Sequence, residues 1–266
     1  MADLNPISLW RRFLTLPNDS RGKTLAVAFL VSAICAVAVT AATVALRPIQ
    51  AQNRAAEQQA RLEALIAAVP SLSGLVAQAG GAALSTVVVD LDAGAAASGV
   101  TPETLDTALA DPANWTTLSP AEDVAGLGNR PDYARIYLLR DGDAVSLAIL
   151  PIAGTGYNGR IQALLALNGD MRTVAGIAVT EQAETPGLGA RIAEPAWQNG
   201  FSGKQLFDES GAMRFAVARG PARTEHEVDG ITGATRTSNA ITQMVRFWMG
   251  PKGYGPLIAA IRRGEF

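Results

Sequence analysis

The chain has 266 residues, 48% of them hydrophobic, and a formal net charge of −2. A charge this close to zero argues against a nucleic-acid partner, which would favour a basic patch. The chain has one cysteine and one histidine, which excludes an intrachain disulfide and a His/Cys metal cluster and disfavours a Ser-His-Asp triad. Any redox chemistry must therefore come from a bound organic cofactor.

The N-terminal part predicts a membrane anchor. Residues 24–46 carry no charge and are long enough to cross a lipid bilayer as one helix, whereas a signal peptide has a shorter apolar core. Four basic residues precede the span and three arginines follow it closely, so the positive-inside rule favours a cytoplasmic N-terminus only weakly. We expect a cytoplasmic segment 1–23, a transmembrane helix 24–46 and the remainder outside the cytoplasm.

Residues 47–85 are expected to form a juxtamembrane helix and a linker. Apolar residues between 62 and 69 recur at helical spacing, Pro70 ends the pattern, and residues 71–85 are rich in Gly, Ala and Ser.

Residues 86–266 predict one α+β domain with a mostly antiparallel sheet, because apolar, β-branched runs alternate with Gly-, Asn- and Asp-containing turns. Residues 95–131 are expected to be irregular or peripheral, with a helix near 103–109. The expected strands are 87–91, 133–140, 145–152, 160–167, 173–180 and 215–218, with short helices near 195–197 and 257–262.

A hydroxyl-rich loop, residues 229–238, precedes an amphipathic helix that is expected to pack on the sheet through Ile241, Met244, Val245 and Trp248. Thr237 or Ser238 is the predicted N-cap. Small residues before a helix N-terminus leave backbone N–H groups free for a phosphate, although such a pattern is most often an ordinary cap.

A second glycine-containing loop runs from Glu184 through Thr185, Pro186, Gly187 and Leu188 to Gly189. Such a sequence is typical of a turn with positive-φ glycines. It also suits a backbone platform that approaches a flat ligand closely, because glycine lacks a Cβ.

The hydroxyl-rich loop resembles the flavinylation motif Asp-x-x-(Ser/Thr)-Gly-Ala-(Ser/Thr)-x-(Ser/Thr) of the FMN-binding domain family. In that family the last hydroxyl forms a phosphoester with FMN. The resemblance implies that a flavin transferase attaches FMN to Thr237 and reads part of the motif. The matching residues before the acceptor are Asp229, Thr232, Gly233, Ala234 and Thr235.

The second loop is similar to the same family. The resemblance implies that Thr185, Gly187, Leu188 and Gly189 lie along the isoalloxazine ring. Glu184 is expected either to hydrogen-bond a polar edge of the ring or to be a solvated loop carboxylate.

Nearly the whole chain resembles two families that carry this domain behind a membrane helix. One is the FMN-binding-domain subunit of Na+-translocating NADH:quinone reductases (the Nqr type), and the other is its counterpart in Rnf-type ferredoxin:NAD+ reductases. The segments closer to the Nqr type are 18–24, 46–50, 237–239, 247–250 and 253–257. Tyr157-Asn158 departs from the Leu-Trp that is usual in the Nqr type and is closer to the Rnf type, and Tyr157 is expected to supply a ring beside the flavin.

Resemblance to the Nqr type implies a relay that passes single electrons between redox centres of neighbouring subunits, within a bacterial inner-membrane complex that oxidises NADH, reduces ubiquinone and exports Na+. Three alternatives stay open at this point. In the first alternative, the chain is an Rnf-type subunit. In the second, it is a non-redox membrane-anchored assembly subunit whose loop only caps a helix. In the third, it is a lone extracytoplasmic flavoprotein reductase.

Overall fold

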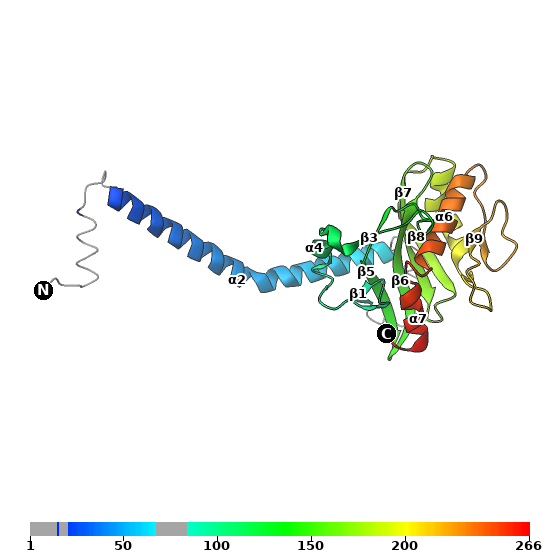
Figure 1. The fold of residues 1–266 in the computed structure, drawn as a ribbon, viewed down its shortest axis with the longest axis horizontal. Helices are drawn as coiled ribbons and strands as arrows, with labels where there is room; N and C mark the ends of the chain where they lie inside the picture. Colours follow the sequence, from blue (N-terminus) through cyan, green and yellow to red (C-terminus); the bar gives the residue numbers. More distant parts are fainter. Residues whose placement is uncertain (1–14, 16–20, 68–83) are drawn as a thin grey trace. The chain divides into compact units, whose positions relative to one another are not determined.

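The computed structural model describes residue 15 and residues 21–67 and 84–266. The chain divides into two compact units, Met1–Ala64 and Leu65–Phe266. Figure 1 colours the ribbon by position in the sequence, from blue at the N-terminus to red at the C-terminus. The expected N-terminal segment, the helix end at Pro70 and most of the linker lie outside the described residues.

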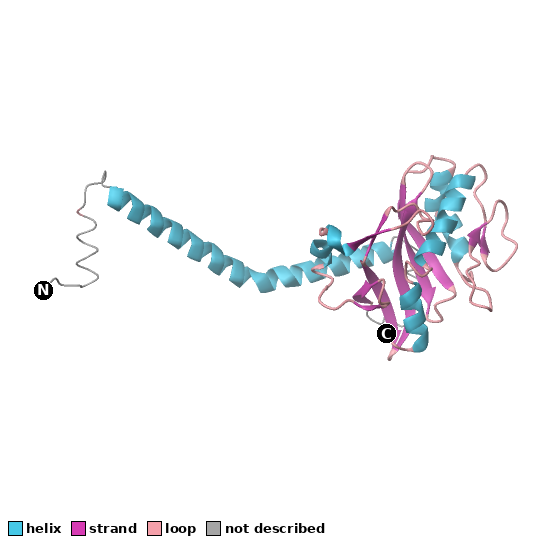
Figure 2. Cartoon of the chain, in the orientation of Figure 1, coloured by secondary structure: helices cyan, strands magenta, loops and turns pink. Residues whose placement is uncertain are grey.

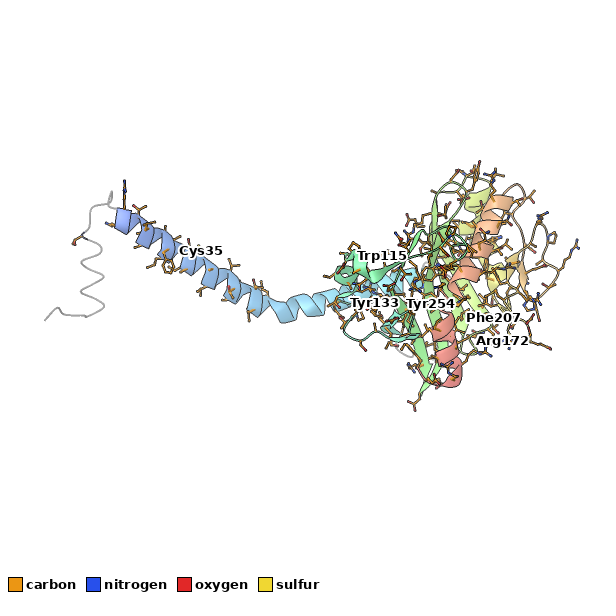
Figure 3. The ribbon with its side chains drawn as sticks, viewed as in Figure 1. Cys35, Trp115, Tyr133, Arg172, Phe207 and Tyr254 are labelled. Atoms are coloured by element: carbon orange, nitrogen blue, oxygen red, sulfur yellow. The ribbon has the colours of Figure 1, made fainter. Side chains whose placement is uncertain are left out.

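The first unit contains most of the helix α2 (Arg21–Ala67). Its residues Arg21–Val44 are long and apolar enough to cross a membrane. Cys35 lies on this stretch (Figure 3) and is exposed. We expected a span and a separate juxtamembrane helix, but α2 is continuous and includes Pro48, a residue that removes one backbone hydrogen bond from a helix interior.

The second unit is built on a six-stranded sheet whose strand pairs are all antiparallel (Figure 2), which confirms the predicted α+β class. Consecutive long strands are hairpin neighbours, as expected from the short turns between them. In spatial order the strands are β2 (Ala95–Ala96), β1 (Ser85–Asp90), β5 (Tyr133–Asp141), β6 (Ala144–Thr155), β7 (Arg160–Asn168) and β8 (Val174–Glu181).

The remaining elements are short, apart from two C-terminal helices, α6 (Thr235–Trp248) and α7 (Gly255–Arg263). An antiparallel pair is formed by β3 (Trp115–Thr117) and β4 (Asn129–Pro131), and a parallel pair by β9 (Ala216–Val217) and β10 (Glu227–Val228). The short helices are α4 (Leu105–Leu109), η1 (Pro112–Asn114), η2 (Gly189–Ala193), α5 (Pro195–Gln198) and η3 (Asn199–Phe201).

Apolar side chains are buried on both faces of the sheet, because successive residues of a strand point to opposite faces. On one face α6 packs with its predicted residues Ile241, Met244, Val245 and Trp248, all at most 4% exposed. The Trp248 indole N–H donates to the carbonyl of Ala153 in β6, at 2.7 Å. The predicted packing of this helix is therefore confirmed.

The β7–β8 connection spans Gly169–Thr173, close to the gap left between the expected strands 160–167 and 173–180, with Met171 at φ 54°. The Asp170 carboxylate accepts from the backbone N–H groups of Arg172 and Thr173 and holds this loop. Region 95–131 consists of short elements, as expected, and includes α4 at the position of the expected helix near 103–109, but it is not wholly peripheral. Its Arg130 is fully buried and donates to Asp92 and to the Lys252 carbonyl.

Tyr254, labelled in Figure 3, joins the C-terminal segment to the sheet. It is fully buried, its hydroxyl donates to the Pro151 carbonyl at 2.8 Å, and burial raises its pKa. Tyr254→Phe removes this bond, and we expect the free energy of unfolding of the full-length protein in detergent to fall by about 1 kcal/mol. Urea unfolding measures this. Tyr157→Phe, at a 56% exposed tyrosine, is the control and should change it by less than about 0.5 kcal/mol.

Candidate functional site

Three segments that are distant in sequence meet at one end of the sheet. The end of β6, the start of β7 and the end of β8 lie at the same end of the sheet, because Thr155 pairs with Arg160 and Gln162 pairs with Glu181. The β6–β7 turn and the segment after β8 therefore lie side by side. The N-terminal turn of α6 joins them through the side chain of Thr237.

Glu184 is the centre of this arrangement. It is only 4% exposed, and its Oε1 accepts from the backbone N–H of Tyr157 at 2.8 Å and of Asn158 at 3.0 Å. Its Oε2 accepts from the hydroxyl of Thr237. A buried carboxylate needs such donors to offset the loss of hydration. The solvated alternative for Glu184 is therefore wrong, and its contact with a flavin ring stays a prediction.

Thr237 is 2% exposed and is the third residue of α6. The predicted cap at Thr237 or Ser238 is wrong: the N-cap is Ala234, which makes no side-chain cap bond. The hydroxyl of Thr237 instead binds Glu184, 53 residues earlier in the chain. Ser238 lies one position further on and accepts, at 3.5 Å, from the N–H of Ile231.

The first turn of α6 presents free backbone donors. Within residues 84–266, no acceptor is found for the N–H groups of Thr235, Arg236 and Thr237. Gly233, just before the cap, has φ +80°, a conformation that glycine adopts without strain. Unpaired N–H groups and the helix dipole together favour an anion such as a phosphate at this position.

Two glycines allow the segments to approach so closely. A Cβ built on Gly189 would lie 2.5 Å from Oγ1 of Thr237 and 2.8 Å from Oε2 of Glu184. A Cβ on Gly156 would collide with Oε1 of Glu184 and would lie 2.7 Å from Ile161. The contact between Thr237 and Glu184 therefore depends on both positions lacking a side chain.

The exposed rim of the site carries side chains that suit a flat aromatic group. Tyr157 is 56% and Leu188 is 42% exposed, which is high for side chains of this size. The Arg236 guanidinium lies 5.2 Å from the centre of the Tyr157 ring. Thr185 accepts from the side-chain amide of Asn158 at 3.0 Å, which ties this rim to the β6–β7 turn.

Within residues 84–266, the other predicted residues are not hydrogen-bonded to Glu184 or Thr237. Asp229 is exposed and accepts through Oδ1 from the Ala222 N–H at 2.6 Å, so it shapes the preceding loop. Thr232, Thr235 and Gly187 are exposed, the last with φ +74°. Sequence reasoning missed Gly156 and the role of Asn158. The Gly-Thr-Gly run at 154–156 was the sequence signal that could have indicated Gly156.

The residues present fit an FMN group. Free N–H donors suit its phosphate, and exposed Tyr157 and Leu188 suit the faces of its ring. Among the described residues there is no group of three or more His, Cys, Asp or Glu side chains that could hold a metal ion.

Comparison with known proteins gives the same assignment. The model of the FMN-binding domain family matches residues 156–250, a range that contains all three segments of the site. The NqrC subunit of the Na(+)-translocating NADH-quinone reductase of Yersinia pestis is 38% identical over 254 residues, covering 93% of this chain and 95% of that protein. The same subunit of Vibrio alginolyticus is 36% identical over 252 residues, covering 93% and 98%.

A solved structure shares the fold. The crystal structure of Shewanella oneidensis NqrC is 27% identical in sequence, with a TM-score of 0.62 over 72% of this chain and 88% of that chain. The apolar helix α2 and these relatives together indicate a membrane-anchored protein with an FMN-binding domain. With relatives above 30% identity along almost its full length, the chain belongs to the NqrC family, whose members are subunits of an oxidoreductase complex, the Na(+)-translocating NADH-quinone reductase.

Proposed function

We propose that this chain is the electron-relay subunit of a Na+-translocating NADH:ubiquinone reductase and carries FMN in phosphoester linkage to Thr237. The observation that carries the proposal is the position of Thr237, whose hydroxyl lies in the first turn of α6 beside three backbone N–H groups for which residues 84–266 offer no acceptor. A phosphate esterified there would be close to those donors and to the positive end of the helix dipole.

The residues around Thr237 have separable tasks in this proposal. The N–H groups of Thr235, Arg236 and Thr237 hold the phosphate, and Arg236 adds a positive charge nearby. Tyr157 and Leu188 bound the ring and exclude water from its faces, with Thr185, Gly187 and Gly189 as the backbone beneath it. Asp229, Thr232, Gly233 and Ala234 shape the loop that the transferase reads.

FMN, when bound, accepts and donates electrons one at a time, and the protein sets its position and electrostatic surroundings. No general acid or metal of the chain is needed for such a relay, which agrees with the single histidine and single cysteine. A covalent tether keeps the cofactor in place where free FMN is scarce.

The partners follow from the same proposal. A flavin transferase attaches FMN, and other membrane subunits of the complex donate and accept the electrons. We place α2 in a bacterial inner membrane with the N-terminus in the cytoplasm and residues 86–266 on the periplasmic side. The basic residues before the span support this orientation.

The test is covalent flavin detected in the gel. The full-length protein is co-expressed with a flavin transferase, and its band is examined for flavin fluorescence after denaturing electrophoresis. We expect a fluorescent wild-type band and a dark Thr237→Ala band. The matched control Ser238→Ala removes the neighbouring hydroxyl and should stay fluorescent.

Two results would contradict the proposal. A dark wild-type band, with the transferase active on a control substrate, would leave a membrane-anchored protein without covalent flavin. A fluorescent Thr237→Ala band would mean that another hydroxyl carries the flavin, with Thr235 and Ser238 as the next candidates.

A further inference from the structure

The contact between Glu184 and Thr237 pairs a carboxylate with the hydroxyl that the proposed function would modify. We infer that Glu184 is the proton acceptor for the Thr237 hydroxyl during flavin attachment, so that the acceptor protein supplies part of the catalytic machinery for its own modification. This inference rests on the proposed covalent site. It assigns Glu184 a chemical role that is separate from binding the finished flavin.

The direction of the hydrogen bond supports this role. An ionised carboxylate can only accept, so Thr237 must donate its proton to Oε2 of Glu184. This leaves the lone pairs of Oγ1 free for attack on another atom. A threonine hydroxyl is a weak nucleophile by itself, and an adjacent base that takes its proton is the usual way of activating it.

The carboxylate is held where a base is needed. Its Oε1 is fixed by the N–H groups of Tyr157 and Asn158, and the Glu184 N–H donates to the side chain of Gln182 at 2.7 Å. Glu184 and Thr237 are 4% and 2% exposed. Water is therefore largely kept from the pair, and the carboxylate cannot rotate away without losing two backbone hydrogen bonds.

The same geometry accounts for access to the hydroxyl. A Cβ built on Gly189 would lie 2.5 Å from Oγ1 of Thr237, and Thr237 is 2% exposed, so we expect a flavin donor to reach this oxygen when the Gly187–Gly189 segment moves aside. Glu184 lies before that segment and is bonded to the β6–β7 turn. The carboxylate can thus keep its position on Oγ1 while the glycine segment opens.

The step balances with a flavin dinucleotide as the donor, because a phosphoester forms readily from a phosphoanhydride. The bond from Oγ1 of Thr237 to the flavin-side phosphorus forms as the phosphoanhydride bond breaks. The hydroxyl proton passes to Oε2 of Glu184, and the nucleoside monophosphate leaves with the electron pair of the broken bond. No atom is oxidised or reduced, and Glu184 later returns the proton to water.

The test measures the rate of flavin attachment. Full-length protein in detergent, purified without flavin, is mixed with a purified flavin transferase, Mg²⁺ and FAD, and quenched samples are read by in-gel flavin fluorescence. Glu184→Gln keeps the size of the side chain and an acceptor for the Tyr157 and Asn158 N–H groups but cannot take up a proton. We expect its initial rate to fall by about 10²-fold, the lower range for loss of a general base.

The matched control is Glu181→Gln, the same substitution three residues earlier at an exposed carboxylate that bonds Gln162. It should react at the wild-type rate. The rate is also followed toward acid pH. Wild type and Glu181→Gln should show the same dependence of the rate on pH, and Glu184→Gln should show a different one, because it lacks the carboxylate that accepts the proton. Close to the pair, the Arg236 guanidinium lies against the ring of Tyr157, whose backbone N–H binds Glu184.

Each outcome decides between defined alternatives. A Glu184→Gln rate within threefold of wild type overturns the inference. A slow Glu184→Gln whose rate depends on pH as the wild-type rate does overturns proton transfer and leaves Glu184 as a positioning residue. If Glu184→Gln does not fold, a wild-type rate that does not change with pH overturns the inference. Absence of flavin on wild type, or its presence on Thr237→Ala, would instead refute the proposed function.

Discussion

Gly189→Ala is expected to slow flavin attachment to Thr237 by about 10²-fold. The added Cβ would lie 2.5 Å from Oγ1 of Thr237, 2.8 Å from Oε2 of Glu184 and 3.0 Å from Cβ of Glu184. These distances are shorter than non-bonded contacts allow, so the methyl group must push the two side chains apart. Displacement of reacting groups by about 1 Å can cost about 10²-fold in rate. The same in-gel fluorescence time course measures the effect.

The matched control for this prediction is Gly200→Ala. Gly200 lies in η3, has no positive φ, and a Cβ there meets only Val228 at an ordinary 3.6 Å. It controls for the general effect of replacing a glycine by alanine, and its attachment rate should match wild type. A wild-type rate for Gly189→Ala would show that the segment over Thr237 opens without resistance and that the close contact has no part in the reaction.

Trp248→Ala is expected to lower the free energy of unfolding of the second unit by about 3–5 kcal/mol, the usual cost of truncating a buried tryptophan. Trp248 is 4% exposed, and its ring lies 5.3 Å from that of Tyr254 and 5.6 Å from that of Phe247. The substitution leaves a cavity between α6 and the sheet and an unpaired carbonyl at Ala153. Urea unfolding of the full-length protein in detergent, followed by near-UV circular dichroism, measures the loss.

Two further variants separate the loss of packing from the loss of the indole hydrogen bond. Trp248→Phe keeps most of the packing but removes the indole N–H, and it should cost about 1–3 kcal/mol for the orphaned carbonyl. Trp115→Ala is the control at a tryptophan that is 36% exposed and bonds the Leu109 carbonyl, and about 1 kcal/mol is expected there. Equal losses for Trp248→Ala and Trp115→Ala would contradict the view that α6 is fixed to the sheet mainly through Trp248.

Anchoring of α6 is also relevant to the site, because the helix carries Trp248 at one end and Thr237 at the other. The end near Trp248 is fixed to β6, and the end near Thr237 is fixed to Glu184. A destabilised α6 should therefore also present Thr237 less well to the transferase. The stability and attachment measurements on Trp248→Ala can be compared directly.

Local patterns in the sequence were sufficient for most of the fold. The apolar span within α2, the long strands β5 to β8 and the buried face of α6 all follow from the period of apolar residues, which depends only on neighbours along the chain. The motif that ends at Thr237 was likewise sufficient for the FMN-binding family, which the comparisons confirm.

The sequence alone did not determine what the key side chains contact. Thr235, Thr237 and Ser238 are similar hydroxyls in one turn, and local preference selected Thr237 or Ser238 as a cap. Tertiary structure places the Thr237 side chain against Glu184, 53 residues away, and leaves Ala234 as the cap. The physical reason is that a buried carboxylate needs a donor more than an exposed helix end needs a cap, since water can satisfy the helix end.

The same holds for the glycines and for the buried arginine. Sequence indicated that the loop after Glu184 allows close approach, but only the assembled sheet brings Gly189 over Thr237 and Gly156 against Glu184. Arg130 lies in a region that reads as irregular, yet it is fully buried between Asp92 and the Lys252 carbonyl. The sequence by itself thus determined the elements and the family. The tertiary structure decided which hydroxyl, carboxylate and glycines meet, because those contacts join segments that only the hairpin register and the packing of α6 bring together.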